Sequence, residues 1–169
     1  MIVKAITLYQ PYASLIAVGA KRFETRGCAT NYRGPIAIHA GLKEPEHLYS
    51  RAFIDGVSNA FGWQGTDDMF WLEMRCLPRG AVIATAKIRS CYRIEDRPQW
   101  TGPEWYKVSL STSTSGFTSE FFMMISEEEY LFGDWRQGRY AWRLDDVQPL
   151  PEPVPARGMQ GLWNWEVTA

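Results

Sequence analysis

Lys21, Glu24 and Arg26 lie within six residues of one another and could together bind or transform a charged ligand. Lys and Arg can hold a phosphate or another oxyanion, whereas Glu can accept hydrogen bonds from a nucleobase or act as a general base. The same spacing also fits a solvated strand edge or an internal salt bridge. We predict that Lys21 and Arg26 bind a ligand, and that Lys21 and Glu24 are catalytic if the chain is an enzyme.

The segments around these charges should hold them in place. Residues 10–19 are expected to form a short buried helix, because apolar residues recur there at the spacing of one helix face. Gly19 suits the left-handed residue that ends a helix. Residues 21–26 follow as a strand, in which strict alternation places Glu24 and Arg26 on the same face.

A second group of candidates combines aromatic and basic side chains near the end of the chain. Residues 139–144 alternate as a strand, and residues 156–161 form a loop bounded by glycine. Aromatic rings can stack on unpaired bases, arginines can contact phosphates, and a glutamine can read a base edge. The aromatic side chains could instead form the core of a barrel.

The composition favours one globular domain. The 169 residues are 46% hydrophobic and 14% aromatic, with eight Trp, and the net charge is −1. A net charge this small excludes a global field that would draw the protein onto nucleic acid. However, residues 1–43 and 79–99 are basic, whereas residues 44–78 and 100–134 are acidic. The basic segments form a local basic face if they meet in the fold; otherwise the charges are scattered over a solvated surface.

The cysteines and the hydropathy bear on compartment and cofactors. Cys28, Cys76 and Cys91 are far apart, and such a sparse, odd count is typical of reduced thiols in a cytoplasm. They show no zinc-binding spacing with the histidines, so we predict no metal and no cofactor. With no signal peptide and no apolar run long enough to span a membrane, we expect a cytoplasmic protein.

The remaining pattern predicts a sheet with helices on its flanks. The expected strands cover residues 2–8, 34–40, 80–94, 146–153 and 162–167, and the expected helices cover residues 45–61, 66–77 and 126–131. Residues 97–124 are rich in turn-forming and polar residues, so we expect an irregular insertion that is either a lid or disordered. With no repeats and no linker, residues 1–169 are interpreted as a single domain.

Several motifs resemble those of the ASCH family (activating signal cointegrator homology). They are QPYASLIAVGAKRFETR at residues 10–26, YRGPIAIHAG at 32–41, GAVIATAKI at 80–88, FGDWRQGRYAWRL at 132–144 and PVPARGMQGLW at 153–163. Tyr12 stands where the family more often has Trp. The resemblance implies an α+β fold of the PUA-like type, a small and mostly antiparallel β-barrel with flanking helices.

The resemblance also implies chemistry. Some small members of this family are amidohydrolases that act on an acetylated cytidine, using a Lys, a Thr three residues later and a Glu from further along the chain. Lys21 matches the first, but Glu24 stands at the position of the Thr, and a carboxylate cannot replace a hydroxyl nucleophile. The distant Glu could be Glu127, Glu128 or Glu129. Other members have been linked to RNA cleavage, which the same groups could perform without a metal.

These observations favour binding of RNA, a nucleotide or a modified nucleoside in a basic and aromatic cleft, in RNA processing or regulation. Beside Lys21 and Arg26, the predicted ligand-binding residues are Gln10, Tyr12, Tyr140, Trp142, Arg157 and Gln160. One alternative is a metal-independent hydrolase, either a ribonuclease or a nucleoside amidohydrolase. Another is a module that binds a partner protein. The oligomeric state is left open.

Overall fold

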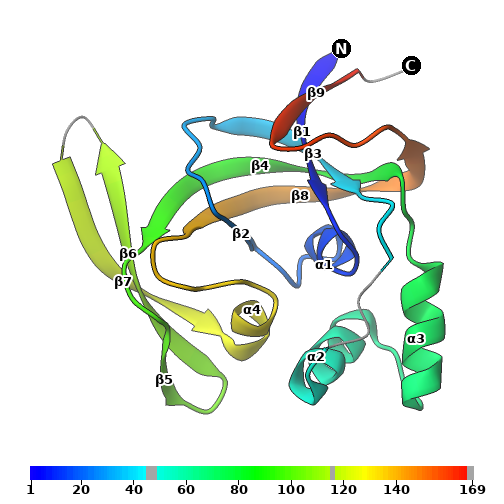
Figure 1. Cartoon of the computed structure of the whole chain (residues 1–169), viewed down its shortest axis with the longest axis horizontal. Coiled ribbons are helices and arrows are strands. Elements are labelled where there is room, and N and C mark those ends of the chain that lie inside the picture. The colour runs from blue at the N-terminus through cyan, green and yellow to red at the C-terminus, as the bar shows by residue number, and fades with distance from the viewer. Residues whose placement is uncertain (45–48, 115–116, 167–169) are drawn as a thin grey trace. The chain divides into compact units, whose positions relative to one another are not determined.

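The computed structural model describes residues 1–44, 49–114 and 117–166. The elements in these residues are β1 (Ile2–Leu8), α1 (Tyr12–Ala17), β2 (Phe23–Arg26), β3 (Gly34–Ala40), α2 (Arg51–Phe61), α3 (Asp67–Cys76), β4 (Ala81–Ile94), β5 (Gln99–Gly102), β6 (Trp105–Thr114), β7 (Phe117–Ser126), α4 (Glu127–Leu131), β8 (Tyr140–Pro155) and β9 (Leu162–Glu166). Figure 1 shows this arrangement, which confirms the predicted α+β class.

The strands belong to one sheet. The strand order is β2-β8-β4-β3-β1-β9, and β6 pairs with β4, β5 and β7. β1 and β3 are parallel, whereas the β1–β9, β2–β8, β4–β6, β5–β6 and β6–β7 pairs are antiparallel. The sheet is therefore mostly antiparallel, as predicted.

The chain divides into two compact units, neither of which is continuous in sequence. The first unit comprises Met1–Ala20, Gly34–Lys87 and Asp146–Ala169, and the second comprises Lys21–Arg33 and Ile88–Asp145. β4 and β8 each contribute residues to both units. In β8 the division falls at Asp146, which has a positive φ of 52°.

In the first unit, three helices lie on one side of β1 and β3 (Figure 1). The predicted buried helix is α1, and Gly19 after it has the left-handed φ of 79° that the sequence suggested. Helix α2 begins after the N-cap Ser50, while residues 45–48 of the predicted helix lie outside the described residues. Helix α3 is capped by Thr66, whose hydroxyl accepts the N–H of Met69 at 3.4 Å.

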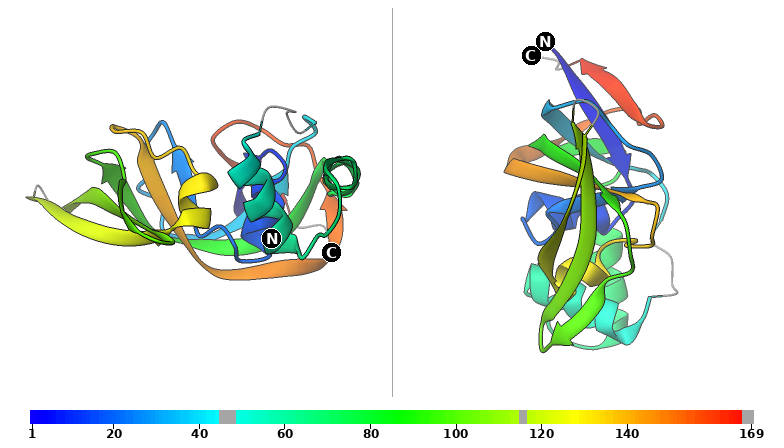
Figure 2. Two further views of the ribbon diagram at one scale, coloured as in Figure 1. Left: turned by 90° about the horizontal axis from the view of Figure 1, so that it is seen from below. Right: turned by 90° about the vertical axis from the view of Figure 1, so that its left-hand side faces the viewer.

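The second unit contains the long β6–β7 hairpin, visible as a twisted ribbon in Figure 2. The two strands pair without interruption from Trp105, opposite Ser126, to Thr114, opposite Phe117. The prediction of an irregular segment at residues 97–124 is therefore wrong in its secondary structure. Ser109 alternates with Val108 and Leu110, which are buried in the core of this unit, and the run of Ser and Thr from 111 to 114 continues the same strand.

Candidate functional site

The pairing of β2 with β8 gathers four of the predicted site residues on one face of the second unit. Glu24 lies opposite Trp142, and Arg26 lies opposite Tyr140. Directly opposed residues of an antiparallel pair point to the same face, so these four side chains are neighbours. Phe23, which points the other way, is buried in the core of the second unit and fixes which face is which.

Lys21 is a buried cation at the entry to β2. Its side chain is only 1% exposed, and its Nζ lies 3.8 Å from Oε2 of Glu24. The ammonium donates hydrogen bonds to the carbonyl oxygens of Phe23, at 2.5 Å, and Phe132, at 2.6 Å. Lysines are almost never fully buried unless they are paired. These bonds hold the positive charge in one place, and they join β2 to the residue that follows α4.

Glu24 lies among three cations. Its Oε1 is 3.5 Å from Nη1 of Arg26, its Oε2 faces Lys21, and Arg139 also attracts its charge. Burial raises the pKa of Glu24 above its usual value, and the three cations oppose this rise. Such a carboxyl group keeps its proton to a higher pH than a solvated one does.

Arg26 is the part of this site that reaches solvent. Its side chain is 26% exposed, and its guanidinium carbon lies 5.9 Å from the centroid of the Trp142 ring, in cation–π geometry. Trp142 itself is buried, and its Nε1–H donates to the carbonyl of Cys28 at 3.1 Å. Trp142 therefore supports Arg26, and Arg26 is better placed than the ring to meet a ligand.

Glu129 is a second buried carboxyl group beside Lys21. Its two oxygens accept the backbone N–H groups of Arg22, at 2.8 Å, and Phe23, at 3.0 Å. Burial raises its pKa, against the attraction of Lys21. The spacing Ser126-x-x-Glu129 is that of a capping box, and the Ser126 hydroxyl accepts the N–H of Glu129. The Glu129 carboxyl group, however, holds the start of β2.

Thr25 and Arg139 brace the other side of β2. The Thr25 hydroxyl accepts the N–H of Asp134 at 2.8 Å, and Arg139 donates to the carbonyls of Thr25 and Asp134, both at 3.2 Å. Hydrogen bonds from Arg136 lower the pKa of Asp134, with the charge of Arg139 adding to the effect. The Thr25 hydroxyl thus has a structural partner, and it points away from Glu24.

Gln10 and Tyr12 belong to the first unit, where their side chains are in contact with its own residues. The Gln10 amide is buried and donates to Ser14 Oγ at 2.8 Å and to the carbonyl of Pro78 at 2.7 Å, while its oxygen accepts the N–H of Ser14 at 3.1 Å. Tyr12 packs edge-on against Phe53, with 5.9 Å between ring centroids. These contacts give Gln10 a clear structural role.

Arg157 and Gln160 are exposed on a loop of the first unit. This loop is fixed by His39, whose Nε2 lies 3.0 Å from the carbonyl of Ala156. Gly158 passes so close that a Cβ atom there would lie 2.5 Å from Cε1 of His39. His39 itself is buried, and this burial lowers its pKa.

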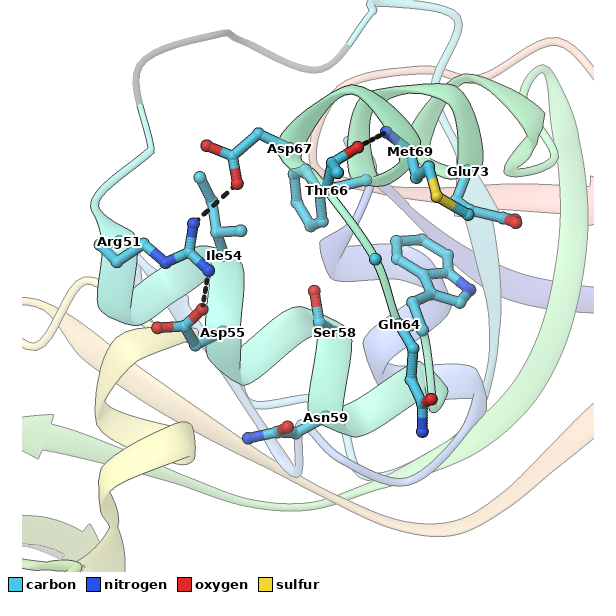
Figure 3. Close-up of a pocket in the computed structure, with 13 residues that line it drawn as sticks. Arg51, Ile54, Asp55, Ser58, Asn59, Gln64, Thr66, Asp67, Met69 and Glu73 are labelled. Carbon is cyan, nitrogen blue, oxygen red and sulfur yellow. Dashed lines mark hydrogen bonds and ion pairs between the residues drawn. The ribbon is translucent and has the colours of Figure 1, made fainter.

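The first unit also has a polar cavity of about 280 Å³ between α2 and α3 (Figure 3). Its main cation, Arg51, is paired with Asp55 at 2.9 Å and with Asp67 at 2.7 Å. Because the cation and these acids already satisfy one another, the cavity offers a ligand less than the β2 site does. In the described part of the chain, no group of three or more His, Cys, Asp or Glu side chains could hold a metal ion.

A comparison with protein families matches the ASCH domain at residues 6–135. The chain belongs to the ASCH family. The match covers well over half of the sequence and confirms the resemblance inferred from the motifs, together with the PUA-like fold class. It includes Lys21, Glu24, Arg26 and Glu129, and it ends before Trp142. No match was found among curated protein sequences.

This ASCH domain thus has a defined set of charged groups on β2 and directly before β2 and β8, with Trp142 of β8 beside them. We call Lys21, Glu24, Arg26, Arg139 and Trp142 the Glu24 cluster.

None of the helices in the residues that the structure describes is both long and apolar enough to cross a membrane.

Proposed function

We propose that this ASCH domain binds RNA, or a nucleotide or modified nucleoside, at the Glu24 cluster. The observation that carries the proposal is the position of Glu24, a buried carboxyl group held between Lys21 and Arg26. An internal salt bridge would need only one cation. Here the surplus of positive charge beside a partly exposed Arg26 favours an anionic ligand.

Glu24 and Arg26 would divide the contacts with the ligand between them. A carboxylate accepts hydrogen bonds from the amino groups of bases, as Glu does from cytosine N4, and arginine binds phosphate through paired N–H donors. In this arrangement Glu24 would contact the base and Arg26 would contact the phosphate or another anion. Lys21 donates to two backbone carbonyls, so its part is to hold Glu24 and to supply positive charge.

Equilibrium binding of a labelled single-stranded RNA, measured by fluorescence anisotropy at several salt concentrations, tests this proposal. We expect Arg26→Ala to weaken binding and to reduce the slope of log K against log salt by about 0.7, the value for one phosphate contact on a single strand. Glu24→Gln should weaken binding without changing that slope.

Arg143→Ala is the matched control, because Arg143 is an exposed arginine on β8, opposite Phe23 on the other face of the β2–β8 pair. It should leave affinity nearly unchanged. An equal loss in Arg143→Ala and Arg26→Ala would point to unspecific attraction, and an absence of RNA and nucleoside binding by the wild type would reject the proposal.

A metal-independent ribonuclease is the second candidate, favoured by the raised pKa of Glu24. A general base works best when its pKa lies near the working pH. The amidohydrolase alternative is less favoured, because Glu24 stands where those enzymes have their Thr. The hydroxyl of the neighbouring Thr25 accepts the N–H of Asp134 and has a structural role. RNA cleavage that persists in EDTA and is lost in Glu24→Gln, with binding retained, would favour the nuclease. Binding without turnover would favour the RNA-binding function alone.

A further inference from the structure

The strand β7 has an open edge. Among the strands in the described part of the chain, β7 pairs only with β6. It is the outer strand of the hairpin in Figure 1. Its sequence, FTSEFFMMIS, contains no proline and a single charge, Glu120. Natural edge strands usually carry proline, lysine or a bulge that discourages pairing with another strand, and a long edge without them is a template for association.

The register of the hairpin shows which backbone groups of β7 face this edge. The Glu127 N–H donates to the Glu104 carbonyl at 2.9 Å, in line with the pairing of Trp105 with Ser126. In an antiparallel pair, hydrogen-bonded and non-hydrogen-bonded positions alternate. The odd-numbered residues of β7 therefore bond to β6, and the even-numbered ones, including Phe122 and Met124, direct their N–H and C=O groups outward.

The side chains at the same even-numbered positions of β7, together with those opposite them on β6, form an exposed apolar face. Phe122 is 67% exposed, and Met124 and Trp105 are each 47% exposed. The register places these three side chains on one face of the hairpin, and Lys107 lies over the Phe122 ring at 3.7 Å. The opposite face, which includes Ile125, is buried in the core of the second unit. Large apolar side chains gathered beside an open edge mark a surface that binds another protein.

We propose that β7 pairs with β7 of a second copy of this chain, antiparallel and about a two-fold axis. The strand is complementary to itself. A register centred on Phe122 places the two Phe122 rings opposite each other and each Met124 opposite Glu120 of the other copy. Aromatic pairs across strands are stabilising. Such a contact is isologous, so it closes after two copies.

The charges fit this register. The two Glu120 residues are offset by four positions along the strands, or about 14 Å at 3.4 Å per residue. This exceeds the Debye length of about 10 Å at 0.1 M salt, so their repulsion is largely screened. An RNA partner would satisfy the outward N–H and C=O groups less well, because strand addition uses the main-chain bonding pattern of another strand.

Light scattering coupled to size-exclusion chromatography, over a range of protein concentrations, measures the predicted dimer. The wild type should have twice the mass of one chain. Met124→Pro should be a monomer, because it removes an outward N–H and leaves the β6–β7 bonds intact. Phe122→Lys should be a monomer because it introduces like charges at the axis. Leu72→Lys, a change at an exposed apolar residue of α3, should remain a dimer.

Amide hydrogen exchange gives a second measurement that does not depend on any variant. In the dimer, the amides of Phe122 and Met124 should be protected like those of odd-numbered β7 residues, and they should lose protection on dilution. A wild type that is monomeric at all concentrations would overturn the proposal. So would a dimer that survives both β7 variants, or a loss of RNA affinity in Phe122→Lys without any change in mass.

Discussion

Replacing Lys21 with Met should destabilise the protein strongly at neutral pH. The change removes an ammonium group that donates to the carbonyls of Phe23 and Phe132 and lies beside Glu24. It also removes the cation that most strongly opposes the raised pKa values of the buried Glu24 and Glu129. Removing one partner of a buried ion pair typically costs about 3–5 kcal/mol. That is a large part of a typical stability of about 5–15 kcal/mol.

The cost of Lys21→Met should depend on pH with a defined sign. Without Lys21, the folded-state pKa values of Glu24 and Glu129 should rise further above 4.5, the ordinary value that the unfolded chain should show. A carboxyl group whose folded pKa is raised gives stability that is fully present below its unfolded pKa and is lost as pH rises through its folded pKa. Each such group contributes at most about 1.4 kcal/mol per pH unit. The cost should therefore be smallest near pH 4, where the loss of the two hydrogen bonds remains, and largest near pH 8.

Urea denaturation followed by tryptophan fluorescence at pH 4.5, 6 and 8 measures this effect. Arg143→Met is the control, because Arg143 is half exposed and its pairing with Asp145 at 3.1 Å should contribute about 0–1 kcal/mol at any pH. A cost of Lys21→Met below 1 kcal/mol at pH 8, or the same cost at all three pH values, would refute the reasoning.

Three further predictions concern stability. Glu129→Ala leaves two N–H groups at the start of β2 without an acceptor, one of them buried, and should cost about 2–5 kcal/mol in urea denaturation, whereas a cost below 1 kcal/mol would contradict the role we give it. Gly158→Ala should lower stability by about 1–3 kcal/mol in a thermal melt, because its Cβ would collide with His39. Gly27→Ala, with its nearest neighbour at 3.9 Å, is the tolerated control, and equal melting temperatures would disprove the contact. Because the folded-state pKa of His39 is lowered from 6.5, its contribution to stability should be present above pH 6.5 and lost as pH falls. The stability of a His39→Asn variant should lose this pH dependence between pH 5 and 8. If stability varies with pH as in the wild type, other groups cause the dependence.

Alternation predicted the faces of β2 from the sequence alone, because one apolar residue decides them. Phe23 must be buried, so Glu24 and Arg26 point the other way, and the pairing with β8 then follows the same pattern. The direction of Lys21 could not be predicted, because it precedes the strand and the period of two does not apply to it. Its partner Phe132 is 111 positions away in the sequence.

Other structural roles could not be predicted, because the same sequence pattern is compatible with more than one role. The spacing from Ser126 to Glu129 indicates a helix N-terminus, and the helix is there, but the pattern carries no information about the distant backbone that Glu129 holds. Similarly, the run of Ser and Thr from 111 to 114 suggests turns, although a strand accommodates it when preceding residues such as Val108 and Leu110 anchor that strand in the core. A side-chain amide such as that of Gln10 is chemically suited to bind a ligand. Only its three hydrogen bonds, to Ser14 and to the carbonyl of Pro78, show that it has a structural role instead.

The interleaved order of the two units has a consequence for how the Glu24 cluster forms during synthesis. Residues 21–33 leave the ribosome early, but the rest of their unit, residues 88–145, follows only after a long segment of the first unit. Contacts between residues so far apart in sequence carry a high loop-closure cost and form slowly. We therefore expect the charged strand β2 to remain unstructured until α4 and β8 have been made, and neither unit can be isolated by a single cut of the chain.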